Sequence, residues 1–364
     1  MGFSCGIVGL PNVGKSTFFN ALTKAGAEAA NYPFCTIEPN VGIVPVPDPR
    51  QKEISKIINP QNEVPTFIKF VDIAGLVRGA SKGEGRGNQF LSHIREVDAL
   101  VHVVRLFEDH NITHVSGKID PLDDLDAILT ELIIKDIESL EARRLRTSKA
   151  AKSKDKDALK EMEYIDLCLD ILGQGKILHN NLVEYHPVLR ELRPLTYKPL
   201  MIVANVDDSE LGNIEKNPVF QKLSAKAAEL GAKVVHFCAK LELELQDLEP
   251  EEVTEMLKEY NLSEPGLYRV IREGYALLNL ITYFTAGVKE VRAWTIEKNT
   301  KAPQAAAVIH TDFEKGFIKA EVISYEDFIQ YGGWAKCREV GKMRIEGKEY
   351  VFQDGDVALF RFNV

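Results

Sequence analysis

A glycine-rich segment near the N-terminus has the residue types and spacing of a phosphate-binding loop. The pattern G-x-x-x-x-G-K-S spans Gly9 to Ser16, after an apolar run and before an expected helix over residues 15–25. Such a loop points its backbone N–H groups at the phosphates of a nucleoside triphosphate, and the helix adds a favourable dipole. The residues expected to bind the triphosphate are Asn12, Val13, Gly14, Lys15, Ser16 and Thr17.

The same loop and two later segments predict a magnesium site. Lys15 would reach the β- and γ-phosphates, and Ser16 would ligate Mg²⁺. Asp72, at the end of an expected strand, would lie near the metal without bonding it, and Gly75 would offer its N–H to the γ-phosphate. Thr36 lies where a switch threonine completes the Mg²⁺ ligands when triphosphate is bound.

The residue after Gly75 predicts slow hydrolysis. Leu76 stands where a Ras-type hydrolase places the glutamine that orients the attacking water, and an aliphatic side chain cannot orient water. His114, in an expected loop, is a candidate replacement because a histidine orients or accepts a proton near neutral pH. The alternative for His114 is a loop histidine without a catalytic part.

Two short segments bear on the base of the nucleotide. Residues 205–208, Asn-Val-Asp-Asp, follow an expected buried strand where guanine-specific GTPases carry N-K-x-D. Residues 238–240, Cys-Ala-Lys, stand where those enzymes carry S-A-K. Val206 replaces the lysine that packs over the base, whereas Asp208 keeps the spacing of the aspartate that accepts hydrogen bonds from guanine. Guanine recognition through Asp208 therefore stays open.

The elements that must position these residues alternate between short apolar runs and helical segments. This alternation is typical of an α/β fold with a doubly wound parallel sheet. The pattern stops near residue 120 and resumes near residue 198, so a segment is inserted within one domain. The expected strands are Phe3–Gly9, Phe67–Ile73, Ala99–Leu106, Leu200–Asn205 and Lys233–Cys238.

The insert, residues 121–197, reads as two long helices packed as an antiparallel pair. Apolar residues recur at three- and four-residue spacing, from Leu125 to Leu145 and from Leu159 to Leu172. Between these stripes, residues 143–160 hold Arg143, Arg144, Arg146, Lys149, Lys152, Lys154, Lys156 and Lys160 against only Asp155 and Asp157. Clustered cations of this kind suit contact with an RNA backbone. The alternative is a turn exposed to solvent that has no partner.

Two stretches follow the last expected strand of the nucleotide domain. Residues 242–255 hold seven carboxylates and are interpreted as a solvated loop and helix start. From residue 279 the chain predicts a small mixed domain of short strands between turns. Its expected strands are Val288–Thr295, Ala305–His310, Lys319–Val322, Glu349–Phe352 and Val357–Phe362. The expected domains are residues 1–120 with 198–278 for nucleotide binding, 121–197 for the insert and 279–364 for the C-terminal domain.

Composition limits the class of protein. With 364 residues, 45% hydrophobic and 27% charged, the chain suits several globular domains. The net charge of −9 argues against coating by nucleic acid but permits a local basic patch. The chain shows no apolar run that would span a bilayer, no signal peptide and no CxxC pair among its five cysteines. We therefore expect a cytoplasmic protein with no membrane partner.

At these positions the chain resembles the YchF/Obg-like ATPase family of P-loop proteins. The resemblance rests on residues 9–17, 31–40 and 72–77 and, in the C-terminal part, on residues 283–294 and 310–317. It runs along essentially the whole chain. The last two stretches resemble a TGS domain, which is a β-grasp module.

The resemblance implies a P-loop NTPase domain, an inserted antiparallel α-helical coiled coil and a C-terminal TGS domain. It also implies Mg²⁺ as cofactor, ATP preferred over GTP, the absence of the catalytic glutamine, and association with ribosomes. By matched position, Asn205 and Val206 would contact adenine. The family carries N-x-x-E in this motif, and Asp208 departs from that pattern.

Three functions fit these residues. The first is a ribosome-associated ATPase that acts as a slow switch, with the helical insert and the TGS domain engaging ribosomal RNA or protein. The second is a GTP-specific ribosome assembly factor that uses Asp208. The third is a nucleotide-gated binding module, in which hydrolysis is incidental and a protein partner is regulated.

Overall fold

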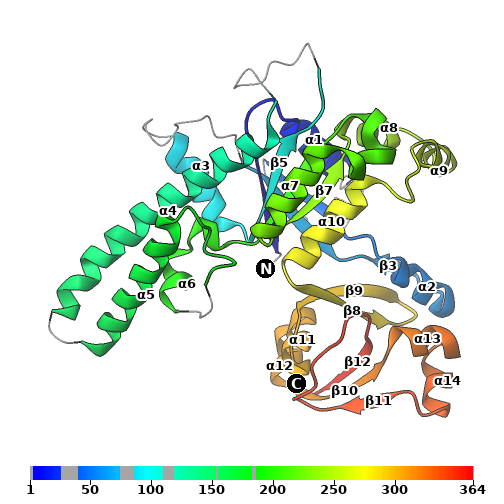
Figure 1. Ribbon diagram of the computed structural model, residues 1–364. Coiled ribbons are helices and arrows are strands. Elements are labelled where there is room, and N and C mark those ends of the chain that lie inside the picture. The colour runs from blue at the N-terminus through cyan, green and yellow to red at the C-terminus, as the bar shows by residue number, and fades with distance from the viewer. Residues whose placement is uncertain are drawn as a thin grey trace. The chain divides into compact units, whose positions relative to one another are not determined.

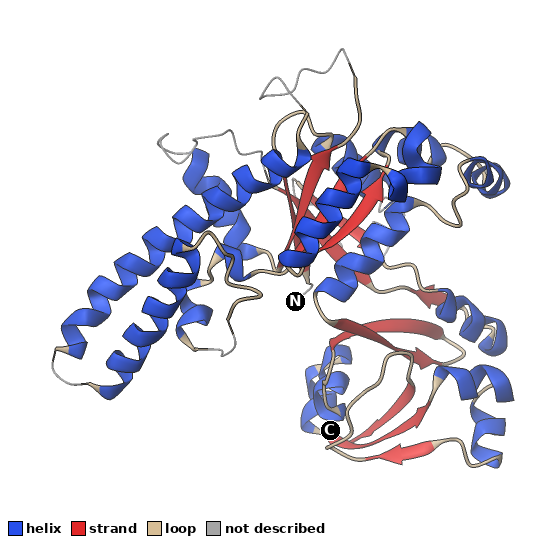
Figure 2. Ribbon diagram, viewed as in Figure 1, coloured by secondary structure: helices blue, strands red, loops and turns tan. Residues whose placement is uncertain are grey.

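The computed structural model of the chain describes residues 3–25, 40–73, 86–109, 119–152, 155–182 and 186–363. The chain forms two compact units, and each draws on two separate stretches of sequence. Unit 1 comprises Phe3–Gly42 and Lys69–Val270, and unit 2 comprises Ile43–Ile68 and Ile271–Val364. Figure 1 follows the chain through both units, and Figure 2 distinguishes their helices from their strands.

Unit 1 is built on a sheet of order β2-β4-β1-β5-β6-β7. The neighbours from β4 to β7 pair in parallel. The strands are β1 (Ser4–Val8), β2 (Val41–Pro45), β4 (Phe67–Asp72), β5 (Ala99–Arg105), β6 (Leu200–Asn205) and β7 (Lys233–Phe237). All five strands expected in the nucleotide domain are confirmed, and β2 is an edge strand that was not expected.

Every residue of β5 and of β6 is buried. Strands that are buried along their whole length belong in a parallel sheet that helices cover on both faces. The helical elements of unit 1 outside the insert are α1 (Lys15–Ala25), α3 (Arg86–Glu96), η4 (Asp208–Lys216), α7 (Pro218–Glu229), α8 (Ala239–Leu245), α9 (Pro250–Glu259) and α10 (Gly266–Leu277), of which α10 continues into unit 2. Because the strands run in parallel, their carboxyl ends meet at one edge of the sheet, where ligands of such folds bind.

The expected helix pair is confirmed as α4 (Pro121–Ala151) and α5 (Lys156–Gly173), which we call the helical arm (Figure 1). Leu140, Ile165 and Leu172 are buried in its apolar seam. Leu145 and Leu159, which the apolar pattern included, are 70% and 43% exposed. The apolar seam therefore ends before the end of the arm, and the last turns hold side chains in solvent.

A buried carboxylate anchors the arm to the segment that follows it. Asp136 of α4 is 1% exposed. It accepts hydrogen bonds from the backbone N–H of Leu195 and of Thr196, both at 2.8 Å, and from the Thr196 hydroxyl at 2.6 Å. Two short helical elements, α6 (Val188–Leu192) and η3 (Leu195–Tyr197), lie in this return segment. Burial raises the pKa of the Asp136 carboxyl, and these hydrogen bonds oppose the rise.

Unit 2 has its own sheet, of order β11-β10-β12-β8-β9-β3. The strands β8 and β9 form an antiparallel hairpin, and β12 lies beside β8 in parallel. The strands are β3 (Asn62–Val64), β8 (Leu280–Ala286), β9 (Glu290–Glu297), β10 (Phe317–Ile323), β11 (Arg344–Glu346) and β12 (Val357–Phe362). This hairpin, followed by a helix and a central parallel strand, is the β-grasp arrangement, and it confirms the expected fold class.

Two apolar clusters hold unit 2 together. One contains Tyr283, Phe352 and alanines of α11 (Ala302–Ile309), and the other contains Phe284 with residues from three helices. Those helices are α2 (Pro49–Ile58), α13 (Tyr325–Tyr331) and α14 (Trp334–Glu339); the short helix α12 (Thr311–Lys315) follows α11. Tyr283 and Phe284 are adjacent in β8, so the two clusters lie on opposite faces of the sheet.

A stretch from early in the chain belongs to unit 2. Residues 43–68, which the sequence-based division assigned to the nucleotide domain, contribute α2 and β3. The strand β3 pairs in parallel with β9. The Gln51 amide of α2 donates to the carbonyls of Val64 and Val291 at 3.0 and 3.1 Å. The boundaries of the three expected domains remain predictions, and the C-terminal unit is larger than residues 279–364.

Three sequence-based assignments are wrong. The expected strand at residues 305–310 lies mostly in helix α11, where Pro303 near the helix start and consecutive alanines favour the helix. The expected strand at residues 349–352 contributes only an isolated bridge between Val351 and Lys301. The acidic stretch is not wholly solvated, since Glu242 is 3% exposed and accepts a 2.6 Å hydrogen bond from Gly266 N.

Among the described residues, no helix is long and apolar enough to cross a membrane.

Candidate nucleotide-binding site

The P-loop connects β1 to α1 in a conformation that only glycine allows at one position. Gly14 has φ +89°, which side chains rarely adopt. A Cβ atom there would come within 2.1 Å of Asn205 Nδ2. Val13 is buried beneath the loop, and the first helical hydrogen bond runs from Phe18 N to Gly14 O at 2.9 Å. The loop is therefore packed directly against the end of β6.

Lys15 points to the carboxyl end of β4. Its Nζ donates a 2.7 Å hydrogen bond to the carbonyl of Ile73 and lies 3.4 Å from Asp72 Oδ1. The two charged side chains are 10% and 20% exposed. Burial lowers the pKa of the Lys15 ammonium, and the Asp72 carboxylate opposes that shift. The structure thus brings together Lys15 and Asp72, two of the residues expected to act on the phosphates and the metal.

A cavity of about 810 Å³ opens beside the P-loop. Its walls come from the P-loop and the start of α1, from residues 107–109 after β5, from residues 205–208, and from residues 238–240 with Leu243. The predicted nucleotide-binding residues that line it are Asn12, Gly14, Lys15, Ser16, Thr17, Asn205, Val206 and Asp208. Val13, also predicted, is buried behind them. One cavity therefore gathers both the phosphate-binding and the base-reading segments.

Asn205 joins the two halves of this cavity. Its amide Nδ2 donates to the carbonyl of Val13 at 3.1 Å, and its Oδ1 accepts from Ala239 N at 3.2 Å. The side chain is 3% exposed. Next to it, Val206 is 2% exposed, and its N–H donates to the Phe237 carbonyl. These contacts show Asn205 fixing the P-loop against the segment after β7.

The two aspartates that follow Val206 differ in their surroundings. The Asp207 carboxylate accepts from Ser209 N at 3.1 Å and from the Ser209 hydroxyl at 2.8 Å, so it caps η4. Asp208 Oδ2 instead lies 3.1 Å from Lys240 Nζ. The hydrogen bonds from Ser209 lower the pKa of Asp207. Asp208, the predicted base contact, is therefore paired across the cavity with a cation.

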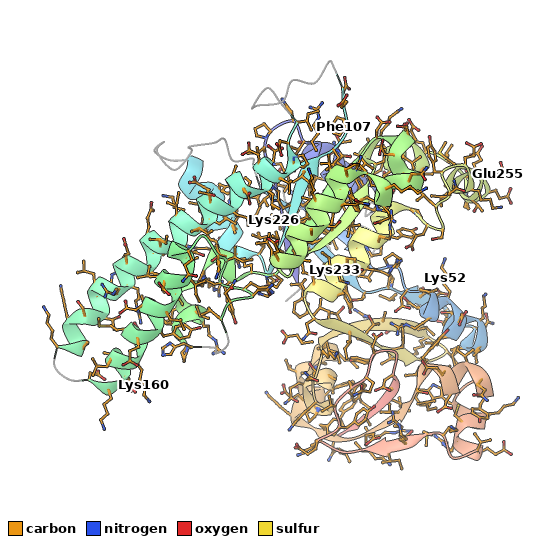
Figure 3. The ribbon with its side chains drawn as sticks, in the orientation of Figure 1. Lys52, Phe107, Lys160, Lys226, Lys233 and Glu255 are labelled. Carbon is orange, nitrogen blue, oxygen red and sulfur yellow. The ribbon has the colours of Figure 1, made fainter. Side chains whose placement is uncertain are left out.

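Sequence reasoning missed an aromatic wall of the cavity. Phe107 lines it and lies at the carboxyl end of β5, where Figure 3 labels it. The guanidinium of Arg105 sits 4.4 Å from the centre of the Phe107 ring, and its Nε donates to the Phe107 carbonyl at 3.1 Å. A large aromatic residue directly after a buried parallel strand was the available signal, because strand ends of this kind line ligand sites.

The residues for magnesium are only partly within the described chain. Ser16 is exposed and lines the cavity, and Asp72 holds a carboxylate oxygen 3.4 Å from Nζ of Lys15, which also lines it. Hydroxyl and carboxylate oxygens are the ligands that Mg²⁺ prefers, so these two residues fit the ion. No group of three or more His, Cys, Asp or Glu side chains among the described residues forms a metal site by itself. Thr36, Gly75, Leu76 and His114 lie outside the described residues.

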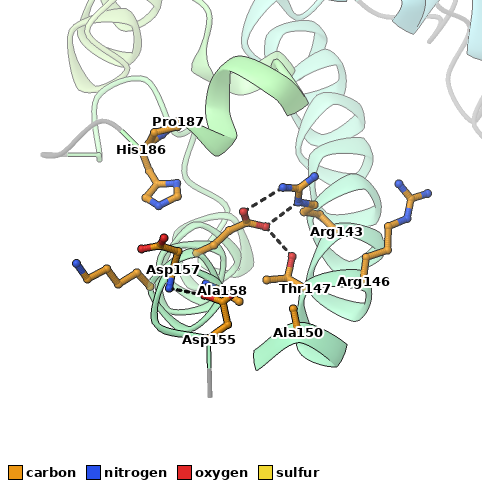
Figure 4. A pocket seen from close by; sticks show the side chains of 11 residues that line it. Arg143, Arg146, Thr147, Ala150, Asp155, Asp157, Ala158, His186 and Pro187 are labelled. Atoms are coloured by element: carbon orange, nitrogen blue, oxygen red, sulfur yellow. Dashed lines mark hydrogen bonds and ion pairs between the residues drawn. The ribbon is translucent and has the colours of Figure 1, made fainter. Parts of the chain in front are cut away.

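The end of the helical arm, residues 143–160, carries cations of two kinds. Arg143 pairs with Glu161 at 2.7 Å and with Glu191 at 2.9 Å, and Arg144 pairs with Asp166. Glu161 accepts from Arg143 Nε at 2.7 Å and from the Thr147 hydroxyl at 2.6 Å. Figure 4 labels Arg143 and Thr147, which line a hollow of about 610 Å³. Within the described part of the chain, five exposed cations of this segment have no acidic partner: Arg146, Lys149, Lys152, Lys156 and Lys160.

The unpaired cations surround the turn between α4 and α5, and Figure 3 labels Lys160 there. We call these five residues the basic tip. Lys154, the eighth cation of the predicted cluster, lies outside the described residues. Clustered cations without acidic partners bind polyanions by releasing their counterions.

Two known families match separate parts of this chain, one near the N-terminus and one at the C-terminus. Residues 4–141 match a family described as "50S ribosome-binding GTPase". Residues 280–363 match the family YchF-GTPase_C, described as "Protein of unknown function (DUF933)". The first match contains the P-loop, and the second contains the β-grasp strands of unit 2.

Relatives match this chain from end to end. The protein named "Ribosome-binding ATPase YchF" from Haemophilus influenzae is 57% identical over 366 residues, and that from Bacillus subtilis is 54% identical over 368 residues. Both alignments cover 100% of this chain and of the relative. The solved structure of the Schizosaccharomyces pombe YchF GTPase is 40% identical, with a TM-score of 0.88, and the match covers 99% of this chain and 97% of that one. The chain belongs to the YchF family of P-loop nucleoside triphosphatases.

Proposed function

We propose that the chain is a ribosome-associated, Mg²⁺-dependent ATPase that acts as a slow nucleotide-dependent switch and hydrolyses GTP less well than ATP. The observation that carries this proposal is the single cavity that joins a complete P-loop to a base-reading segment without its lysine. The names of the bacterial relatives, "Ribosome-binding ATPase YchF", support both the nucleotide and the partner.

The P-loop side of the cavity supplies the phosphate chemistry. Backbone N–H groups of Asn12, Val13 and Gly14 would cradle the phosphates, as such loops do. Lys15 would contribute a positive charge where negative charge develops on the γ-phosphoryl group. Ser16 and Thr36 would hold Mg²⁺ with Asp72 nearby, and the ion would supply charge neutralisation between the β- and γ-phosphates.

The base side favours adenine. Val206 stands where guanine-specific enzymes carry lysine, and its side chain is buried rather than spread over the base. Phe107 and Leu243 add apolar surface to the cavity, which suits a purine ring. Asn205 and Val206, the predicted adenine contacts, are held at the cavity wall by their own hydrogen bonds. Asp208 keeps a GTP-specific function open as the competing candidate.

The expected rate is low because the usual water-orienting glutamine is replaced by Leu76. Gly75 and His114 are the proposed contributors at the γ-phosphate end. A slow hydrolase keeps its triphosphate form long enough to bind a partner, which is the behaviour of a switch. Proposed contacts with ribosomal RNA are the basic tip and the TGS domain of unit 2, and such contacts would put the chain in the cytoplasm.

Titration with fluorescent ATP and GTP analogues in the presence of Mg²⁺ tests the nucleotide assignment. We expect tighter binding of the ATP analogue and slow release of phosphate from ATP. Equal or tighter binding of the GTP analogue would contradict the ATPase proposal and favour the GTP-specific function. Tight ATP binding without phosphate release above that of a Lys15→Ala variant would favour the nucleotide-gated binding module.

A further inference from the structure

A salt bridge crosses the base end of the nucleotide cavity. Asp208 follows β6 at the start of η4, and Lys240 is the second residue of α8, directly after β7. Asp208 Oδ2 and Lys240 Nζ are 3.1 Å apart, and both residues line the cavity. The pair thus links the two segments that take the places of N-K-x-D and S-A-K.

The backbone holds these two segments in fixed register. Ala239, next to Lys240, donates its N–H to Asn205 Oδ1 at 3.2 Å, and Val206 N donates to the Phe237 carbonyl at 2.9 Å. These hydrogen bonds join the ends of β6 and β7 just before the residues of the salt bridge. Asp207 is already occupied as the cap of η4. Asp208 is therefore the carboxylate of this segment that Lys240 meets.

The occupation of Asp208 matters because the two purines present different groups to a carboxylate. Guanine presents two donors, N1–H and the N2 amino group, and a free carboxylate accepts from both. Adenine presents the N1 lone pair, which a free carboxylate repels. A carboxylate paired with an ammonium group neither accepts freely from guanine nor strongly repels adenine.

We propose that Lys240 is a specificity-determining residue that withholds Asp208 from guanine and thereby favours adenine. Guanine must displace the Lys240 ammonium before Asp208 can accept its two hydrogen bonds, whereas adenine leaves the pair intact. Specificity would then arise because guanine binding, unlike adenine binding, must break the salt bridge. The inference rests on the proposed function. Guanine-specific enzymes also carry a lysine at the place of Lys240, so the feature that would set this chain apart is the pairing of that lysine with Asp208 where the N-K-x-D lysine is replaced by Val206.

The exposure of the pair sets the size of the effect. The Lys240 side chain is 71% exposed and that of Asp208 is 28% exposed. Exposed pairs are weak, so we expect a change of about three-fold in relative affinity rather than a complete switch. The Asp208 carboxylate raises the pKa of the Lys240 ammonium, so the contact favours the charged form of Lys240.

The test measures dissociation constants for ATP and GTP, with Mg²⁺, in the full chain and five variants. Lys240→Met should tighten GTP binding about three-fold relative to ATP, and Lys240→Arg should keep the wild-type ratio. In an Asp208→Asn background, Lys240→Met should leave the ratio unchanged. Lys258→Met, an exposed lysine of α9, is the control for the loss of one positive charge.

Three outcomes would overturn the inference. They are an unchanged ratio in Lys240→Met, the same shift in Lys258→Met, and a shift that persists when Asp208 is already asparagine. Failure of the proposed function gives a different result, namely GTP preference in the unmodified chain. The coupling between Lys240 and Asp208 is read in either case from the cycle of the unmodified chain, Lys240→Met, Asp208→Asn and the double variant.

Discussion

The ammonium group of Lys15 lies 3.4 Å from Asp72 Oδ1 and donates to the backbone carbonyl of Ile73. This contact ties the P-loop to the end of β4, where the sequence places the segment that would meet the γ-phosphate. The phosphates must compete with Asp72 and the carbonyl for the same ammonium group. Lys15 therefore connects phosphate binding to the position of Asp72.

Replacing Lys15 by alanine should abolish most hydrolysis. The variant loses the P-loop ammonium group that would meet the phosphates, and removal of such a donor typically lowers kcat by about 100-fold. The measurement is phosphate release at saturating ATP and Mg²⁺. Lys24→Ala is the matched control, because Lys24 lies in the same helix but pairs with Asp247 on the surface. Equal losses in both variants would argue against a phosphate-binding role for Lys15.

Asn205→Ala should weaken ATP and GTP binding by similar factors. The amide holds Val13 and Ala239 together, so its loss loosens both walls of the cavity without favouring either base. The fold should also lose about 1–3 kcal/mol for each buried partner left without a hydrogen bond. Isothermal titration with both nucleotides and urea unfolding of the free chain measure the two effects. A selective loss of ATP binding would instead support a direct contact between Asn205 and adenine.

The sequence predicts features that neighbouring residues encode better than features that depend on contacts between residues far apart in the chain. The P-loop and the five predicted strands of unit 1 were predictable, because a local motif and short, mainly apolar runs encode them. Ala305 and Ala306 were misassigned because apolar residues next to turns suit a strand or a short helix equally well. The place of α2 in unit 2 depends on contacts such as that of Gln51 with Val291, far apart in sequence.

The residues of the site were predictable from the sequence, but the contacts between their side chains were not. The motif spacing identified Asp208 and the segment of Lys240. The sequence around either residue does not indicate that the two side chains form a salt bridge. Phe107 was missed because no motif contains it, although it follows a buried strand. The eight cations at residues 143–160 counted equally in sequence, whereas the fold neutralises Arg143 and Arg144 with acids of other segments.

Removing cations from the basic tip should weaken binding to ribosomes. The variant Lys149→Gln, Lys152→Gln, Lys156→Gln loses three exposed charges without breaking an ion pair among the described residues. If each lysine contacts a phosphate, the slope of log affinity against log salt should fall by about one per lysine. Co-sedimentation over a range of salt concentrations measures this slope.

A control variant separates local contact from net charge. Lys216→Gln, Lys222→Gln, Lys258→Gln removes the same charge from η4, α7 and α9 of unit 1. We expect its co-sedimentation and salt slope to match those of the unmodified chain. Equal weakening in both variants would mean that the basic tip has no specific part and that total charge alone matters.

Glu242 links the helix after the base-reading segment to the start of α10. It lies in α8 and accepts a 2.6 Å hydrogen bond from Gly266 N, the first residue of α10. Burial raises the pKa of Glu242 to about 7, and the hydrogen bonds from Gly266 and Leu267 and the charge of Arg269 oppose the rise. The folded chain therefore binds this proton more tightly than the unfolded chain does.

This raised pKa fixes the sign of a pH effect on stability. The contribution of Glu242 is fully present below its ordinary pKa of 4.5 and is lost as the pH rises through about 7. From pH 5 to pH 8 the loss amounts to about 2–3 kcal/mol. Glu242→Gln keeps an oxygen to accept from Gly266 N but cannot ionise. Relative to the unmodified chain, the free energy of unfolding of the variant should therefore increase by about 2–3 kcal/mol from pH 5 to pH 8.

Urea unfolding of both proteins at several pH values between 5 and 8 measures the effect. The difference between the two free energies of unfolding is the quantity to follow, because the buried His102 and the half-buried His236 titrate in both proteins and their effects cancel. Their pKa values are lowered by burial to about 3 and about 4, so they destabilise the fold as the pH falls below 6.5. A difference that stays constant with pH would show that Glu242 is ionised in the fold throughout.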